Sequence, residues 1–490
     1  MSTSAGRTAS KSYMTAMCTA SCSRRLLPAP GQGLLLVALR KLSAQARPIL
    51  SRAREHTREL HTHQWRAVSI LDDWVSKEAR PISLRQLMVF GRSLNEQRLV
   101  SSANYVRTEL PRRLAHRIRD MQTLPYCVVA NSHFNQVYEL YYEAFDKFRR
   151  VPEVRSLEDN DRFCEIISDM LKRHLSVIPK LAMGILETSA VEMLPAQELD
   201  GFMNAILRSR ISRRVIAEQH LSLTETFHSS THNEAVCSPD SEFIGKVFLK
   251  CNAADVIQRC GRAVLALARS AYGDDVALPE IKLSGHLDAN FPFILSHMEY
   301  IIGELLRNSV QSVIEQQLRL GKPVAGSQLA PIEVTICESS KHVVIRVSDQ
   351  GGGIPRDVLP YLWSFVKGPR SQRILSNLTQ VPMMAATLQE VRVDEPAENG
   401  RGGGGGSGAP SRGTRSPSTD YVSSLSSLTS RPPNLRLGMG LPMSRIYAEY
   451  WAGSLEAQSL WGYGVDVFFQ VSKLGNKNEQ LLTRAMMDAV

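Results

Sequence analysis

The sequence Asp349-Gln350-Gly351-Gly352-Gly353 decides the fold class of this chain. It directly follows residues 342–348, whose alternating apolar and polar side chains predict a β-strand. A carboxylate at a strand end can accept a hydrogen bond from a ligand, and consecutive glycines let the backbone approach that ligand closely. Glycine turns are common, however, so this stretch identifies a site only together with other motifs.

A second motif, Glu304-Leu305-Leu306-Arg307-Asn308, lies upstream within residues 298–320, where apolar residues recur at helical spacing. Glu304 and Asn308 are four residues apart, so they share one face of the predicted helix. An amide oxygen can bind a hard cation such as Mg²⁺, and a carboxylate one turn away can accept a proton. Taken alone, such a polar pair usually marks a solvated helix face.

A third motif, Leu437-Gly438-Met439-Gly440-Leu441-Pro442, precedes a predicted helix over residues 443–451. Glycines at a helix N-terminus leave free N–H groups that favour phosphate, although a single GxG is weak evidence. Residues 370–435 separate the two glycine motifs and are rich in Gly, Ser, Thr and Pro. Their composition predicts a mobile insertion.

The two halves of the chain follow different patterns. Helical stripes cover 94–121, 133–149, 166–181 (with a bend near Pro179) and 199–227, whereas strands are predicted at 280–283, 332–337, 342–348 and 465–471. This predicts an α+β protein, a four-helix bundle followed by a mixed α/β layer.

The three motifs, in this order, resemble the N, G1 and G2 boxes of the GHKL ATP-binding superfamily, in which a lid separates the second and third boxes. The resemblance implies a Bergerat α/β sandwich that binds ATP. Further stretches resemble the mitochondrial 2-oxoacid dehydrogenase kinases, and the resemblance covers about residues 80–474. These stretches are 81–87, 109–115, Arg173-His174 with 177–179, and 210–214 with Gln219-His220. Residues 285–293 and 447–455 look closer to the branched-chain type than to the pyruvate type.

This resemblance implies a serine kinase that inactivates the E1 component of a 2-oxoacid dehydrogenase complex, docks on the lipoyl domain of E2 and forms a homodimer. Carried over by position, Glu304 would be the general base, Asn308 the Mg²⁺ ligand, and Asp349 the adenine acceptor. The positions that would border the nucleotide are Gly351, Gly353, Gly438, Gly440 and Leu441.

His174, Arg210 and Arg214 match family positions that line an allosteric carboxylate pocket in the bundle. Two guanidinium groups beside a histidine suit a 2-oxoacid carboxylate. Without the resemblance, surface charge and a packing histidine would be the simpler interpretation.

The sequence departs from the family pattern at several positions. Tyr300 stands where pyruvate-type enzymes have a histidine, and Gln311 where an arginine is usual. The remaining departures are Arg436 for the first glycine of the third motif, Val465 for a threonine near adenine, and Lys367-Gly368 where Ser or Thr is usual.

The N-terminal segment accounts for most of the formal net charge of +10, because residues 1–54 hold nine Lys or Arg and no acidic residue. The remainder is close to neutral, which argues against nucleic-acid binding. This composition predicts a transit peptide and a mitochondrial matrix location, the rival being a secretory signal. We expect no membrane span and, with eight cysteines and no CxxC pair, no disulfide framework.

The expected organisation is a transit peptide at 1–55, a regulatory and docking bundle at 58–238, an ATP-binding kinase domain at 239–474 with a disordered lid at 370–435, and a tail at 475–490. Two alternatives stay open. One is a protein histidine kinase, and the other is a non-catalytic regulator that keeps the fold and binds the lipoyl domain without handling nucleotide efficiently.

Overall fold

The computed structural model describes residues 68–481, apart from 93, 191–193, 233–242, 274–275, 322–328, 381–436 and 476. The predicted transit peptide and most of the predicted lid therefore lie outside the described residues. The chain divides into 1–66 and 67–490, and every described residue belongs to the second unit.

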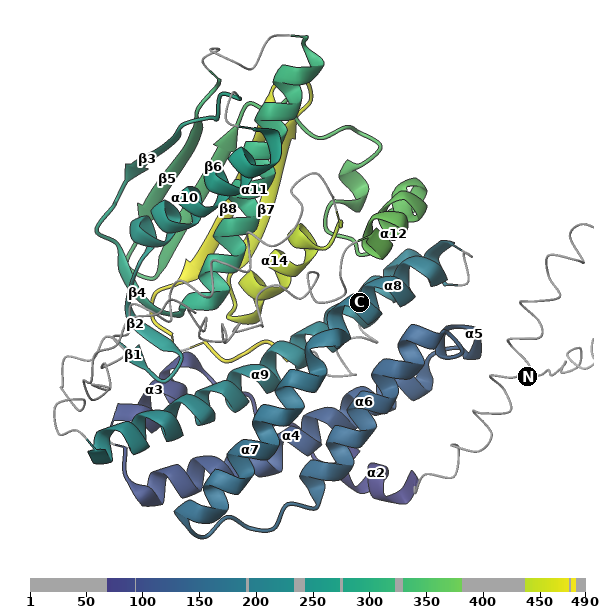
Figure 1. The fold of residues 1–490 in the computed structure, drawn as a ribbon, viewed down its shortest axis with the longest axis vertical. Helices are drawn as coiled ribbons and strands as arrows, with labels where there is room; N and C mark the ends of the chain where they lie inside the picture. The colour runs from purple at the N-terminus through teal and green to yellow at the C-terminus, as the bar shows by residue number, and fades with distance from the viewer. Residues whose placement is uncertain are drawn as a thin grey trace, which may run out of the picture. The chain divides into compact units, whose positions relative to one another are not determined.

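The first half of the described chain is helical (Figure 1). Its elements are α2 (Val68–Val75), α3 (Leu84–Arg92), α4 (Glu96–Thr123), α5 (Tyr126–Val129), α6 (Ser132–Arg149), α7 (Leu157–Arg173), the short 3₁₀ helix η1 (His174–Ser176), α8 (Val177–Ala190) and α9 (Ala196–His232). The side chains of Asn95, Asn131 and Ser156 accept backbone N–H groups at the starts of α4, α6 and α7. These caps satisfy amides that have no partner within the helix.

One predicted helix is in fact two. The apolar stripe over 166–181 predicted a single helix bent near Pro179, but the chain breaks earlier, at η1, and α8 begins at Val177. Pro179 lies in the first turn of α8, where a proline removes no intrahelical hydrogen bond. Periodicity alone missed the break because the apolar positions stay in phase across it.

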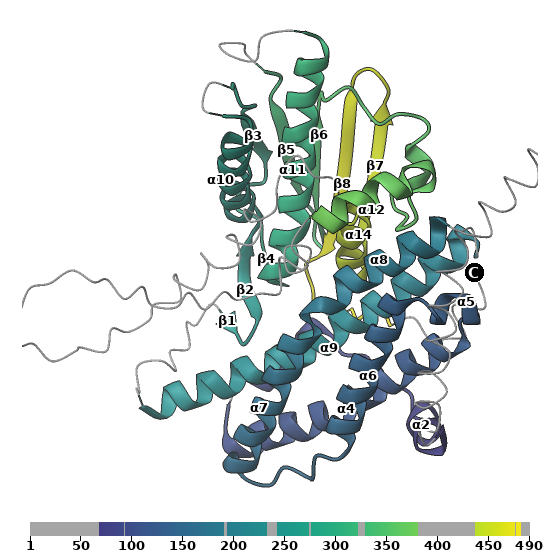
Figure 2. The same cartoon turned by 45° about the vertical axis from the view of Figure 1, so that its right-hand side comes forward.

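The second half is a mixed α/β region (Figure 2). A five-stranded sheet has the order β3-β5-β6-β8-β7, in which only β3 and β5 run parallel. Its strands are β3 (Ile281–Gly285), β5 (Ile332–Glu338), β6 (His342–Asp349), β7 (Ser454–Leu460) and β8 (Gly464–Ser472). A smaller sheet joins β1 (Phe243–Ile244), β2 (Val247–Asn252) and β4 (Asn290–Ile294). The predicted order, a helical half followed by a mixed α/β half, is confirmed.

Helices α10 (Ala253–Tyr272), α11 (Leu295–Arg319) and α14 (Gly440–Tyr450) accompany the strands, with α11 packing on β6 and α14 on β7 and β8. Burial alternates along β6, so Val343, Ile345, Val347 and Asp349 are buried and their neighbours less so. Because side chains two apart share one face of a strand, Asp349 ends an otherwise apolar row that faces the helical layer.

The start of the predicted mobile insertion is ordered. Residues 371–380 form α12 (Ser371–Gln380), which packs against α8 and buries Leu378. This corrects the expectation that disorder begins at residue 370. The amphipathic spacing of Ile374, Leu375 and Leu378 is the signal that the overall composition of 370–435 concealed.

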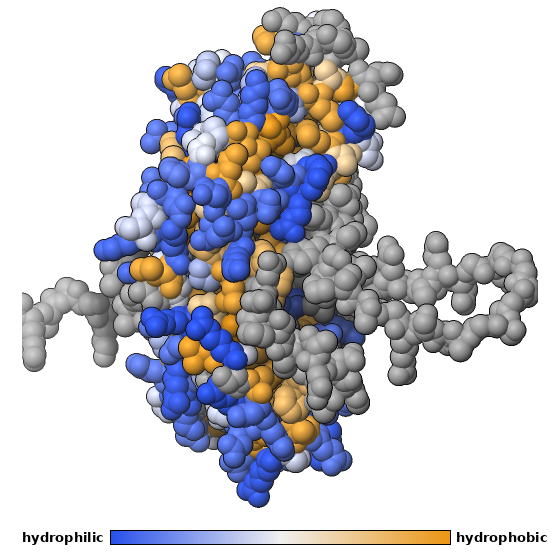
Figure 3. Space-filling model, turned by 90° about the vertical axis from the view of Figure 1, so that its left-hand side faces the viewer, coloured by the Kyte–Doolittle hydropathy of each residue, from blue (hydrophilic) through white to orange (hydrophobic). Residues whose placement is uncertain are grey.

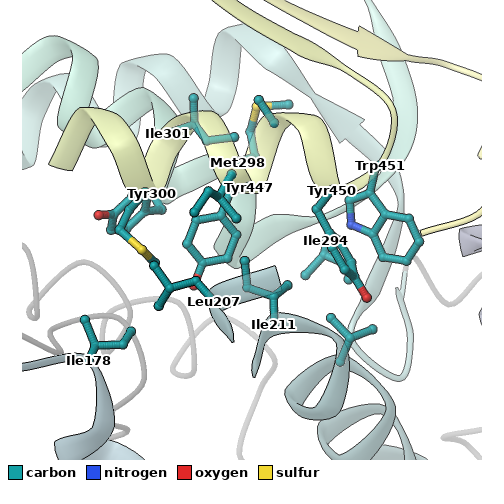
Figure 4. Packing of buried hydrophobic residues seen from close by; sticks show 14 of the residues in the cluster. Ile178, Leu207, Ile211, Ile294, Met298, Tyr300, Ile301, Tyr447, Tyr450 and Trp451 are labelled. Atoms are coloured by element: carbon teal, nitrogen blue, oxygen red, sulfur yellow. The ribbon is translucent and has the colours of Figure 1, made fainter. Parts of the chain in front are cut away.

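Apolar side chains join the helical half to the α/β half. Leu207 and Ile211 of α9 face Tyr447 and Tyr450 of α14, as Figure 4 shows. All four are buried and belong to one continuous hydrophobic core. The start of α14 is therefore supported from the helical half.

A buried ionic cluster also joins the two halves, and we call it the Arg113 cluster: Arg113, Glu109, Tyr450 and Glu479. The guanidinium of Arg113 lies 2.8 Å from the carboxylate of Glu479 and 3.3 Å from that of Glu109, and Tyr450 donates to Glu479. Burial alone would lower the pKa of Arg113, but the Glu479 carboxylate raises it above its ordinary value. The predicted C-terminal tail thus contributes a buried group.

The surface is mixed in character. On the face shown in Figure 3, hydrophobic residues are interspersed with hydrophilic ones, which is ordinary for a folded protein. No helix in the described part of the chain is long and apolar enough to cross a membrane.

Candidate active site

The site forms where α11 meets the start of α14. Glu304 is a buried residue of α11, and its Oε2 lies so close to Gly440 that a Cβ there would be 2.1 Å away. A side chain at this position would displace the carboxylate, so glycine lets Glu304 keep its place beside the start of α14. Two of the three sequence motifs therefore touch each other.

Because of this contact, adding a single methyl group at Gly440 should affect activity. Gly440→Ala should lower nucleotide-dependent activity at least about tenfold, because the Cβ must push Glu304 away from its position. Gly201→Ala on α9 is the matched control, because a Cβ there meets nothing within 4 Å. Activity assays and melting curves of both variants test the idea, and equal activities for the two would contradict it.

Arg307 holds the Glu304 carboxylate. Its Nη2 lies 2.6 Å from Glu304 Oε2, and both side chains are largely buried. This ion pair fixes the direction in which the carboxylate points. The sequence motif contains Arg307 but gives no sign of this role, since a three-residue spacing from Glu304 fits any ordinary helix pair.

Asn308 follows Arg307 and is partly exposed, one helical turn beyond Glu304. No group of three or more His, Cys, Asp or Glu residues that could hold a metal occurs in the described ranges. Asn308 offers one amide oxygen, and a single protein ligand of this kind suits Mg²⁺, which takes most of its other ligands from phosphates and water.

Asp349 lies at the end of β6 with both carboxylate oxygens engaged. Ser309 Oγ donates to Oδ2 at 2.9 Å, and the Gly351 N–H donates to Oδ1 at 2.9 Å. Burial raises the pKa of Asp349, whereas these hydrogen bonds oppose the rise. Ser309 was missed from sequence because nothing in the motif distinguishes a hydroxyl that faces the sheet. Val465 lies directly opposite Asp349 on β8.

Gly353 and Gly438 of the glycine motifs have backbone angles that other residues rarely adopt. Gly353 has φ +74°, and a Cβ there would lie 2.4 Å from the carbonyl oxygen of Leu460. Gly438 has φ +70°, and a Cβ there would lie 2.9 Å from Cε of Lys367. At both positions the lack of a side chain lets another part of the chain approach closely, whereas the motifs predicted a close approach to a ligand.

The structure also places other residues named from the sequence, namely positions that depart from the family pattern and Leu441. Tyr300 is buried with its ring 5.1 Å from that of Tyr447, and Gln311 donates to Glu315 at 2.8 Å. Leu441 is the second residue of α14 and packs partly buried against the core. Arg436 lies outside the described residues.

A separate cavity lies inside the helical half, with an empty volume of about 400 Å³ that is partly open to solvent. Its lining includes the predicted His174, Arg210 and Arg214, together with Arg213, which was not among the predicted residues. Arg213 is buried and stacks on the ring of Tyr141 at 4.3 Å. No carboxylate is among the lining residues.

The positive charge of this cavity comes from arginine. Burial, with Arg213 and Arg210 nearby, lowers the pKa of His174 to about 3, so its imidazole is neutral near pH 7. His174 Nε2 lies 3.2 Å from the carbonyl oxygen of Leu140, and Arg210 donates to the carbonyl of His174 at 3.0 Å. Guanidinium groups around an apolar hollow suit a small carboxylate.

Comparisons with known proteins agree with this architecture. The family described as mitochondrial branched-chain alpha-ketoacid dehydrogenase kinase matches residues 81–248. Mitochondrial pyruvate dehydrogenase (acetyl-transferring) kinase 2 of Saccharomyces cerevisiae is 31% identical over 446 residues, which is 86% of this chain and 87% of the yeast protein.

Two further relatives extend the comparison. The mitochondrial pyruvate dehydrogenase (acetyl-transferring) kinase of Arabidopsis thaliana is 27% identical over 84% of this chain and 96% of its own length. Isozyme 4 of Homo sapiens is 25% identical over 82% of this chain and 83% of its own length. The similarity thus extends well beyond the helical half, and this chain belongs to the mitochondrial pyruvate and branched-chain 2-oxoacid dehydrogenase kinase family.

Proposed function

We propose that this protein transfers the γ-phosphoryl group of Mg-ATP to a serine of the E1 component of a mitochondrial 2-oxoacid dehydrogenase complex. The observation that carries the proposal is the approach of the buried Glu304 carboxylate to Gly440 at the start of α14. It sets a proton acceptor beside a helix N-terminus, which favours phosphate.

Different side chains have different roles in the proposed reaction. Glu304 accepts the proton of the serine hydroxyl, and Arg307 orients that carboxylate. Asp349 accepts a hydrogen bond from the adenine amino group, because a carboxylate offers about four acceptor positions and the donors Ser309, Gly351 and the Val465 N–H do not fill them.

The residues also fit Mg²⁺ and ATP. Asn308 would hold Mg²⁺, and Gly351, Gly353, Gly438, Gly440 and Leu441 would border the nucleotide. When bound, ATP would supply the phosphoryl group, and Mg²⁺ would neutralise the negative charge that develops on that group during transfer. Phosphoryl transfer requires mainly positioning and charge stabilisation, so the protein needs no covalent chemistry of its own.

The direct test is incubation with purified pyruvate and branched-chain dehydrogenase complexes and labelled ATP. Relatives named as pyruvate dehydrogenase kinases make pyruvate E1 the first substrate to try, whereas residues 285–293 and 447–455 favoured the branched-chain type. We expect label on serine of E1 and loss of dehydrogenase activity. No label on either complex would contradict the proposal.

The acid stability of the label and the affinity for Mg-ATP separate the two alternatives. Phosphohistidine is acid-labile, so label that survives acid excludes a histidine kinase. A non-catalytic regulator would bind the lipoyl domain yet show no measurable Mg-ATP affinity. We further propose that the protein docks on the E2 lipoyl domain, which co-sedimentation tests, and that it forms a homodimer, which light scattering tests. The proposed domain boundaries, 58–238 and 239–474, are tested by limited proteolysis.

We also propose that the cavity lined by His174, Arg210 and Arg214 binds a small 2-oxoacid that regulates the kinase. The ligand should raise the melting temperature of the wild-type protein by mass action. Arg210→Met should remove most of that rise, because a guanidinium–carboxylate bond is lost. The control is Arg173→Met, since Arg173 instead pairs with the exposed Glu143. An equal ligand-induced rise in both variants would refute the assignment.

A further inference from the structure

Lys367 is a lysine that the proposed mechanism does not use. It lies between two 3₁₀ turns, η3 (Leu359–Tyr361) and η4 (Gly368–Arg370), and is partly buried. Its Nζ donates to the carbonyl oxygen of Tyr361 at 3.3 Å and to that of Ser364. Both carbonyl oxygens are neutral, so they accept hydrogen bonds from the ammonium group of Lys367 without balancing its positive charge.

No carboxylate in the described part of the chain forms an ion pair with Lys367 Nζ. Asp200 of α9 is near enough to act on it through its charge, but its oxygens accept from Ser364 Oγ at 2.5 Å and from the Phe365 N–H at 2.7 Å. Burial lowers the pKa of Lys367 to about 8, and Asp200 opposes this shift. A cation in this position gains from an anionic ligand.

The position of Lys367 beside the third glycine motif indicates that its anionic ligand is a phosphate. A Cβ on Gly438 would lie 2.9 Å from Lys367 Cε, so the lysine stem packs directly on the third glycine motif. Gly440, two residues further along, touches Glu304. Lys367 and Glu304 therefore lie against the same short glycine segment at the start of α14, where free N–H groups favour phosphate.

We propose that Lys367 is a binding residue for the polyphosphate of the nucleotide, and that its ammonium group turns from the two carbonyls to a phosphate oxygen when the nucleotide binds. A compact ammonium on a flexible stem suits this movement. The inference rests on the proposed function, because it assigns the phosphates to the glycine segment between Lys367 and Glu304.

The first test compares nucleotide affinities by calorimetry for the wild type, Lys367→Gln, Lys367→Arg and Arg370→Gln. Glutamine keeps an N–H donor for the carbonyls but carries no charge. We expect Lys367→Gln to weaken ATP and ADP binding about 10- to 100-fold while leaving adenosine binding unchanged, and arginine to restore part of the loss. Arg370, which pairs with the exposed Asp357, is the matched control and should behave as wild type.

The second test needs no variant, so it holds even if Lys367→Gln fails to fold. Trinitrobenzenesulfonate modifies neutral amines, and peptide mass spectrometry follows the rate at Lys367. Saturating ATP should slow modification at least about tenfold, whereas adenosine should not, because only a phosphate contacts the amine.

The outcomes distinguish the two proposals. If the wild type binds ATP and phosphorylates E1 but Lys367→Gln binds ATP equally well, or ATP gives Lys367 no protection, only the lysine inference fails. A loss of adenosine and ATP affinity by the same factor would assign Lys367 a structural role and also overturn the inference. A wild-type protein that binds no nucleotide would overturn both.

Discussion

Glu304→Gln is expected to lower the rate of phosphoryl transfer about 10²- to 10⁴-fold while leaving nucleotide affinity and the melting temperature nearly unchanged. The amide has the same shape as the carboxylate and can still accept from Arg307, which lies 2.6 Å from Glu304 Oε2. It cannot take a proton from the serine hydroxyl. The loss should therefore fall on the chemical step rather than on binding.

Single-turnover kinetics and calorimetry measure the two effects separately. Glu299→Gln is the matched control, because Glu299 is another buried carboxylate of α11 and pairs with Arg259 of α10 at 3.7 Å. That variant should retain transfer. If Glu304→Gln loses ATP affinity by the same factor as it loses rate, Glu304 serves nucleotide binding and is not the base.

Glu479→Ala is expected to destabilise the folded protein by about 3–5 kcal/mol, because it leaves Arg113 buried with a smaller share of its counter-charge. The side chain of Glu479 is fully buried, and that of Arg113 is 2% exposed. Glu109 alone, at 3.3 Å from Arg113, compensates only in part. Removing a partner from such a pair costs more than the pair contributes as a whole.

Denaturant unfolding monitored by circular dichroism gives the free energy. Glu153→Ala is the control, since Glu153 pairs with Arg155 on the surface, where the two side chains are 59% and 79% exposed. That pair should contribute almost nothing. If Glu479→Ala unfolds at the same denaturant concentration as the control, the Arg113 cluster does not stabilise the protein.

The sequence was informative where a function needs residues close together along the chain. Glu304 and Asn308 are separated by one helical turn, and Asp349 is followed at once by its glycines, so spacing alone predicted their local geometry. The resemblance implied that Glu304 and Gly440 belong to one nucleotide site, but their direct contact is visible only in the structure, because no local pattern links residues so far apart.

Other contacts had no signal in the sequence. Ser309 and Arg307 sit within an ordinary helical pattern, and only the packing of α11 shows that one meets Asp349 and the other meets Glu304. Lys367 departs from the family pattern, but only the structure shows that it lies beside Gly438. In each case the missing information was which distant segment lies opposite the residue.

The Arg113 cluster also has a consequence for the order of folding. Arg113 and Glu479 are 366 residues apart, so a ribosome adding about 5–20 residues per second delivers the glutamate roughly 20–70 s after the arginine. During that interval the nascent helical half holds Arg113 without its principal counter-ion. The ion pair between Arg113 and Glu479 can therefore form only when the chain is nearly complete, so the helical half cannot reach its final packing around Arg113 before then.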